Sequence, residues 1–146
     1  MSAGTGITHS EFNGSGEDML KFLQIWIIPE RLGAEPRYGQ ATVGPIAPNT
    51  IRTVVGPKGT GTPLWINQQA WLSMGHATSK EKLIYNRRQD RNGVFIFAIN
   101  GSITVGGNAE SHYLAERDGL GIVDTSRLEI TADADATFIV IDVPVG

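Results

Sequence analysis

The chain has 146 residues and a formal net charge of -3, with charged residues at 18% and no long run of lysine or arginine. One domain with a sizeable core fits this length, and direct binding to nucleic acid or to an anionic membrane is disfavoured. Cysteine is absent, which excludes disulfides, thiolate metal sites and a cysteine nucleophile and leaves histidine and carboxylates as metal ligands. No stretch approaches the roughly 18 to 20 apolar residues of a membrane span, and no signal sequence follows Met1, so a cytoplasmic protein is expected.

Short strands separated by turn residues dominate the predicted elements. Eighteen glycines and seven prolines lie between runs rich in valine, isoleucine and aromatic residues, which is typical of strands joined by tight turns. The run Phe22 to Ile28 ends at Pro29, and its composition predicts a strand buried on both faces. Further strands are predicted at residues 49–55, 64–67, 70–74 and 83–86.

The strongest local signal is a hairpin over Gly93 to Gly107. Asn100-Gly101 lies at its centre, and this dipeptide favours the two-residue turn of a β-hairpin. Short strands follow at residues 120–123, 128–131 and 137–143. No repeat and no alternation of strands with helices is present, so the prediction is an all-β, mostly antiparallel jelly-roll β-sandwich.

Several motifs in this order resemble the pirin family. They are Met-Ser-Ala-Gly-Thr-Gly-Ile-Thr-His-Ser-Glu-Phe-Asn at residues 1–13, Phe-Leu-Gln-Ile-Trp-Ile-Ile-Pro at 22–29, Pro-Arg-Tyr at 36–38, Asn-Gln-Gln-Ala-Trp at 67–71 and Arg-Asp-Gly-Leu-Gly at 117–121. Pirin-like proteins are bicupins, so the resemblance implies a cupin double-stranded β-helix. It assigns residues 1–40, with the apolar strand 22–28, to a remnant of a preceding cupin and a connector, and residues 41–146 to a C-terminal cupin domain. Met1 is an internal residue in the relatives, which implies a shortened bicupin.

The resemblance also implies a metal site to which this chain contributes two ligands. His9 and Glu11 match the His-x-Glu motif that supplies the last two of the family's four ligands. The other two come from an earlier His-x-His segment, which this sequence lacks. Alternate strand residues share a face, so the pair can meet one ion, although two ligands alone should bind weakly.

Two interpretations of this pair stay open. His9 and Glu11 are either inherited residues on an exposed terminus, or a second chain completes a site for iron or another divalent transition metal. The second cupin is expected to hold no metal of its own, because the segment Tyr85 to Gly93 lacks His-x-His.

The remaining candidates favour structural roles. His76 and His112 are isolated from other ligand types in the sequence and are expected on loops or the surface. Asp118 and Asp124 precede glycine and threonine, which is typical of turns. The segment Gly56 to Gly61 misses the phosphate-loop spacing and is interpreted as a glycine-rich loop.

Two functions therefore compete. The main hypothesis is a non-catalytic binding or oligomerisation module, since half of the family's metal site is absent, with a small-molecule ligand possible. The alternative is a metal-dependent dioxygenase of the quercetinase type with a site completed by a second chain, and a co-regulator role is a lesser variant. The apolar segment 20–30 predicts a homodimer, because an exposed apolar strand is a template for pairing.

Overall fold

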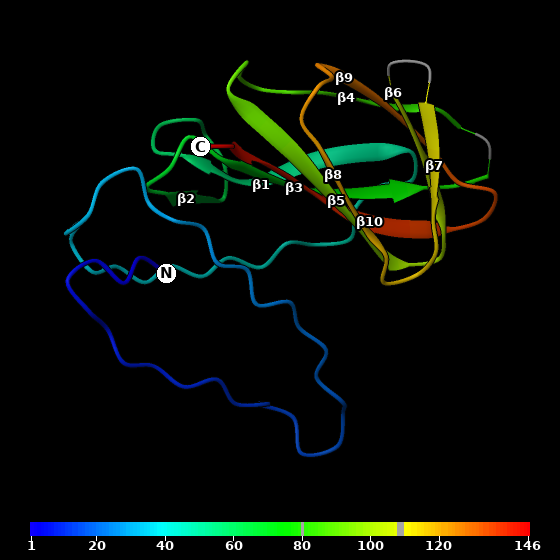
Figure 1. The fold of residues 1–146 in the computed structure, drawn as a ribbon. Helices are drawn as coiled ribbons and strands as arrows, with labels where there is room; N and C mark the ends of the chain where they lie inside the picture. Colours follow the sequence, from blue (N-terminus) through cyan, green and yellow to red (C-terminus); the bar gives the residue numbers. More distant parts are fainter. Residues whose placement is uncertain (80, 108–109) are drawn as a thin grey trace.

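The computed structural model describes residues 1–79, 81–107 and 110–146 and folds them into two facing sheets (Figure 1). The larger sheet has the order β2-β1-β3-β10-β5-β8 and the smaller one β4-β9-β6-β7. Among the described strands only β1 and β2 pair in parallel. The predicted all-β, mostly antiparallel jelly-roll β-sandwich is confirmed. The strands are β1 Thr50–Pro57, β2 Leu64–Ile66, β3 Trp71–Ala77, β4 Leu83–Asn86, β5 Asn92–Asn100, β6 Ile103–Gly107, β7 Glu110–Leu114, β8 Gly119–Ile122, β9 Arg127–Thr131 and β10 Ala136–Pro144.

The core lies between the two sheets and follows from strand alternation. Every second residue of β10 points inward, so Phe138 and Val140 are fully buried, and the inward residues of β5 meet them across the ladder. The smaller sheet closes the core with aliphatic side chains from β6 and β9, namely Ile103, Val105, Leu128 and Ile130.

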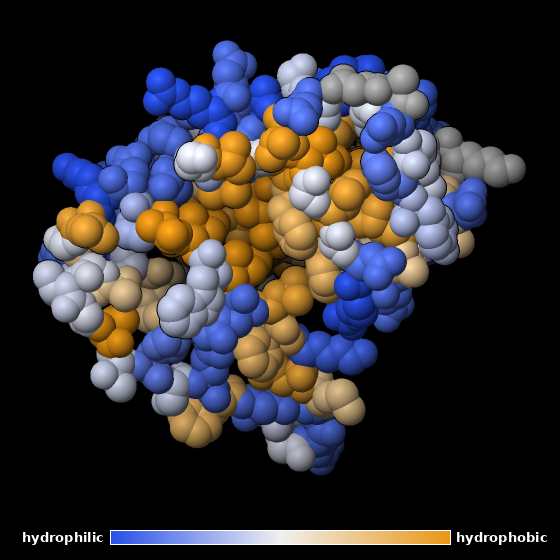
Figure 2. Space-filling view, in the orientation of Figure 1, coloured by the Kyte–Doolittle hydropathy of each residue, from blue (hydrophilic) through white to orange (hydrophobic). Residues whose placement is uncertain are grey.

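The outer face of the larger sheet is also apolar. The outward residues of β5 and β10 include Phe95, Ile141 and Val143, and Phe95 is 40% exposed. Antiparallel sheets with one face in water normally place polar residues there. Residues 25–28 pass along this face. Between these residues and the sheet lies a groove of about 340 Å³, which the arm lines on one side and β5 and β10 line on the other. Apolar side chains gather across the middle of the view in Figure 2, where Figure 1 places the larger sheet.

The predicted hairpin over Gly93 to Gly107 is wrong in its pairing. β5 pairs with β10 and β8 in the larger sheet, whereas β6 pairs with β7 and β9 in the smaller one. A two-residue hairpin of the expected type needs positive φ at both turn residues. Gly101 has a φ of 71°, but Asn100 is not in that region, and its side chain donates to Thr137 Oγ1 at 3.2 Å. The turn therefore carries the chain from one sheet to the other.

The segment Phe22 to Ile28 does not form the expected strand. Between residues 1 and 49 strand pairing is limited to an isolated bridge of Ser2 with Arg37. A strand requires a neighbouring edge for its backbone groups, and here a side chain supplies one contact instead, from Gln68 Nε2 to the Ile28 carbonyl at 2.9 Å. The segment runs as an extended arm beneath the sandwich (Figure 1).

The other predicted strands are confirmed, with ends shifted by at most three residues. β7 is the strand that the sequence pattern missed. Four of its five residues are exposed, so it lacks the apolar alternation by which a strand is recognised.

Candidate functional site

His9 and Glu11 lie on the extended N-terminal arm rather than on a strand. His9 Nε2 and Glu11 Oε1 are nevertheless 3.7 Å apart, with side chains that are 40% and 51% exposed. An imidazole nitrogen and a carboxylate oxygen are donor types that suit a divalent transition metal. In the described part of the chain no group of three or more His, Cys, Asp or Glu residues could hold an ion.

A second pair of the same composition lies on β7. His112 Nε2 and Glu110 Oε2 are 3.6 Å apart, and both side chains are exposed. His112 is thus a surface residue, as expected, but it has a carboxylate neighbour. The short distance between His9 and Glu11 is therefore not distinctive by itself, and the pair on β7 offers a matched control.

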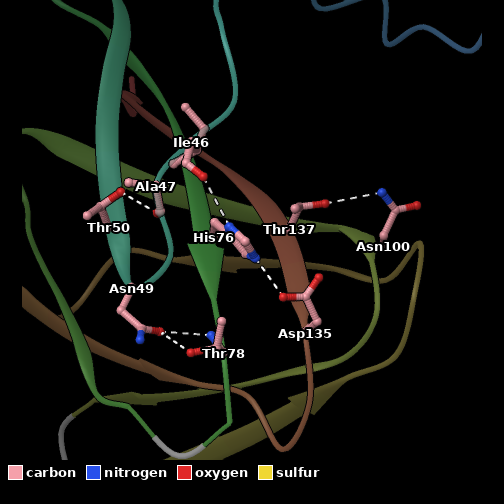
Figure 3. Close-up of polar contacts among 9 residues, drawn as sticks. All are labelled: Ile46, Ala47, Asn49, Thr50, His76, Thr78, Asn100, Asp135 and Thr137. Atoms are coloured by element: carbon pink, nitrogen blue, oxygen red, sulfur yellow. Dashed lines mark hydrogen bonds and ion pairs between the residues drawn. The ribbon is translucent and has the colours of Figure 1, made fainter.

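His76 is partly buried on β3 and contacts a residue on each side of its ring (Figure 3). Its Nε2 lies 2.7 Å from Asp135 Oδ1, and its Nδ1 lies 3.1 Å from the Ile46 carbonyl oxygen. Both partners can only accept, so both ring nitrogens must carry a proton to satisfy them. The hydrogen bond to Asp135, followed by that to Ile46, raises the pKa of His76. The expected loop or surface position of His76 is wrong, because the residue is partly buried on a strand and cross-links β3 to Ile46 and Asp135.

The His76 cluster fastens the connector before β1 to the sheet. Asn49, at a φ of 56°, accepts hydrogen bonds on Oδ1 from the Thr78 backbone N–H at 2.8 Å and from Thr78 Oγ1 at 2.9 Å (Figure 3). Thr50 Oγ1 donates to the Ala47 carbonyl at 2.7 Å. These contacts hold a loop rather than converge on a substrate, so we assign them a structural role.

A buried carboxylate that sequence reasoning missed lies at the other end of β10. Asp142 is fully buried and accepts three hydrogen bonds: from Tyr85 Oη at 3.0 Å, from the Arg88 backbone N–H at 2.7 Å and from Asn92 Nδ2 at 2.6 Å. Burial, and then the charge of Asp142, raises the pKa of Tyr85. The sequence did contain a signal for this buried carboxylate, because Asp142 occupies an inward position of the otherwise apolar strand β10.

The loop after β2 anchors the N-terminal arm. Asn67 Nδ2 donates to Ser2 Oγ at 3.1 Å, and the Asn67 carbonyl accepts from the Glu30 N–H at 2.8 Å. Arg37 stacks over the Trp65 ring at 3.8 Å and donates to the Trp65 carbonyl at 3.0 Å. The motif around residues 67–71 thus holds the arm that carries His9 and Glu11.

Asp118 has the turn role that its sequence context predicts. Its Oδ2 accepts from the Ala115 N–H at 3.0 Å, and its own N–H donates to the Ala115 carbonyl at 3.0 Å.

Comparison with known proteins gives one family and several long relatives. The family model "Quercetinase C-terminal cupin domain" matches residues 53–143. The chain is 33% identical over 144 residues to quercetin 2,3-dioxygenase from Escherichia coli K12, covering 99% of this chain and 59% of the relative. It is 35% identical over 150 residues to a putative quercetin 2,3-dioxygenase from Pseudomonas aeruginosa, covering 98% of this chain and 60% of that one.

Comparison with solved structures gives matches to a protein of the same family. YhhW from Escherichia coli matches with a TM-score of 0.71 and 26% identity, covering 83% of this chain and 49% of that one. The bacterial pirin YhhW in complex with nickel(II) matches with a TM-score of 0.69 and 27% identity, with the same coverage. The predicted pirin-like resemblance is confirmed, and the chain spans about 59% of the length of its curated relatives. Within the described residues no helix is suited to crossing a membrane.

Proposed function

This chain belongs to the quercetinase C-terminal cupin family of pirin-like proteins, and from that premise we propose that it acts as a binding and assembly module, not as a dioxygenase by itself. The observation that carries this proposal is the unpartnered apolar surface of the arm. Phe22, Trp26 and Ile28 are 63%, 86% and 81% exposed. Exposed apolar patches of this kind mark sites of association.

The occupant that we propose for this surface is a second copy of the chain, joined through residues 20–30. Closed twofold association is the commonest way for a soluble protein to cover such a patch. Each large apolar side chain contributes about 1.5 to 3 kcal/mol when buried, so three from each protomer contribute roughly 9 to 18 kcal/mol. Association costs about 4 to 15 kcal/mol, so burial of these side chains is of the size needed to offset that cost in a dimer.

Sedimentation velocity tests this assembly. We expect the wild-type chain to sediment as a dimer and Trp26→Glu to sediment as a monomer, because the charge would be buried in the interface. Tyr113→Glu is the matched control, since Tyr113 is 66% exposed on β7, away from the arm. A monodisperse wild-type monomer at micromolar concentration, or an unchanged Trp26→Glu dimer, would contradict the proposal.

A second candidate function is a metal-dependent dioxygenase completed by another chain. It is favoured by the convergence of His9 Nε2 and Glu11 Oε1 at 3.7 Å, by the curated relatives named quercetin 2,3-dioxygenase, and by the nickel complex of YhhW. In this reading His9 and Glu11 hold iron or another divalent transition metal with ligands from the partner. The metal, when bound, would supply Lewis-acid and redox chemistry, and the two residues would orient it.

Elemental analysis of untagged protein separates the two functions. The module predicts substoichiometric metal that does not change in His9→Ala. Near-stoichiometric metal that is lost in His9→Ala, but kept in the control His112→Ala, would instead support the shared site and justify dioxygenase assays.

A further inference from the structure

A polar cavity of about 500 Å³ lies outside the His9–Glu11 pair and outside the apolar groove. It is lined by the residues Thr53, Thr60, Gly61, Thr62, Trp71 and Arg88. These residues come from β1, the loop that follows it, the start of β3 and the turn between β4 and β5. Its volume is within the range of small-molecule sites.

Gly56 lets the walls of this cavity approach one another. A Cβ at Gly56 would lie 2.8 Å from Thr60 Oγ1, 3.1 Å from Thr62 Cγ2 and 3.1 Å from Trp71 Cδ1. All three are lining residues, so a side chain at this position would displace the loop or the indole. Gly56 and Pro57 at the end of β1 are buried, whereas the loop residues 58–61 are exposed, so the loop forms an open rim of the cavity.

The two loop threonines face the cavity as hydrogen-bond acceptors. Thr60 Oγ1 donates to the Pro57 carbonyl at 2.7 Å, and Thr62 Oγ1 donates to the Leu64 carbonyl at 2.7 Å. Each hydroxyl has one proton and two lone pairs, so these bonds occupy both protons. The two oxygens also lie within hydrogen-bonding distance of each other, at 3.3 Å, and each keeps a lone pair that a donor placed near them could use.

Arg88 supplies the opposite chemistry, because its guanidinium is exposed and has no counter-ion among the described residues. Its Nη2 donates to Thr53 Oγ1 at 3.0 Å, which leaves further N–H groups to donate. The nearby Asp142 carboxylate takes the Arg88 backbone N–H rather than the guanidinium. An Arg fork of this kind matches a carboxylate.

We propose that this cavity binds a small hydroxylated organic acid, with its carboxylate on Arg88, its hydroxyl donating to Thr60 and Thr62, and its apolar body against the Trp71 indole. The site is independent of assembly and of the metal ligands. It uses one cation, one pair of acceptors and one flat apolar wall, so neither an anion nor an alcohol alone would satisfy it.

Isothermal titration calorimetry at neutral pH with 4-hydroxybenzoate as the probe tests this site. Three comparison ligands each lack one feature of the probe: benzoate lacks the hydroxyl, phenol lacks the carboxylate and inorganic phosphate lacks the apolar body. We expect 4-hydroxybenzoate to bind more tightly than all three. Arg88→Met should weaken it by about tenfold or more, since a hydrogen bond to a charged group is lost. Arg91→Met is the matched control, because Arg91 is exposed in the same turn outside the cavity lining.

Thr62→Val reports on the second contact. It should remove most of the preference for 4-hydroxybenzoate over benzoate while leaving benzoate binding unchanged. The proposal is overturned if 4-hydroxybenzoate gives no heat at millimolar concentration, if phosphate or benzoate binds equally well, or if Arg88→Met binds like the wild type. The urea midpoint of each variant shows whether weaker binding results from loss of the fold instead of loss of the contact.

Discussion

Replacing Asp142 by alanine should destabilise the fold more than any surface substitution. Asp142 is fully buried and ties β10 to Tyr85 at the end of β4, to the Arg88 backbone, and to Asn92 at the start of β5. These elements belong to both sheets. The carboxylate therefore links the two layers of the sandwich at one end.

The magnitude follows from the groups that lose their partner. Tyr85 and Asn92 are 3% and 1% exposed, and a buried donor without an acceptor costs about 1 to 3 kcal/mol. Asn92 keeps its bond to the Gln69 carbonyl, which limits its share, and relief of the buried charge offsets part of the loss. We expect Asp142→Ala to lower the free energy of unfolding by about 3 to 5 kcal/mol, out of the 5 to 15 kcal/mol typical of a domain.

Two further variants make the reasoning specific. Tyr85→Phe removes one donor and leaves no orphan, so it should cost only about 1 to 2 kcal/mol. Asp142→Asn keeps one acceptor oxygen but turns the other acceptor into an amide donor; its cost should lie between the other two. Urea unfolding with linear extrapolation measures all three. A loss below about 1 kcal/mol for Asp142→Ala, or equal losses for alanine and asparagine, would refute the network as a stabilising link.

Two more predictions concern β3. The Asp135 hydrogen bond and then the Ile46 carbonyl raise the pKa of His76 above 6.5, so the stability from its charged form should be complete below that pH and be lost as pH rises through the raised pKa. The difference in urea midpoint between the wild type and His76→Gln should therefore shrink with rising pH, and a constant difference would contradict the cross-link. A Cβ at Gly75 would overlap the Phe138 ring, so Gly75→Ala should cost about 1 to 3 kcal/mol or more. Gly121→Ala, with nothing within 4 Å of the added Cβ, should have almost no effect, and urea unfolding of both variants measures the difference.

The sequence by itself predicted most strands and the family, because turn residues, alternation and motifs are local properties. β4 was predicted with its observed ends, and β10 within one residue at each end. His9 and Glu11 were recognised through the family motif, and their side chains lie 3.7 Å apart although the residues are on the arm and not on the strand that the spacing argument assumed. Their role as metal ligands stays a prediction.

Only the tertiary structure decided which strands pair and which polar groups meet. The Asn100-Gly101 signal is the same for a hairpin and for a turn between sheets, and the choice depends on β10 and β8 occupying the edges of β5. Residues 22–28 have strand composition, but a strand also needs a neighbouring edge, which composition does not encode. His76 meets Asp135 across 59 residues, and Asp142 meets Tyr85 across 57. The first contact needs β3 and β10 to pair in the larger sheet, and the second needs the two sheets to pack on each other, so no local pattern could reveal them.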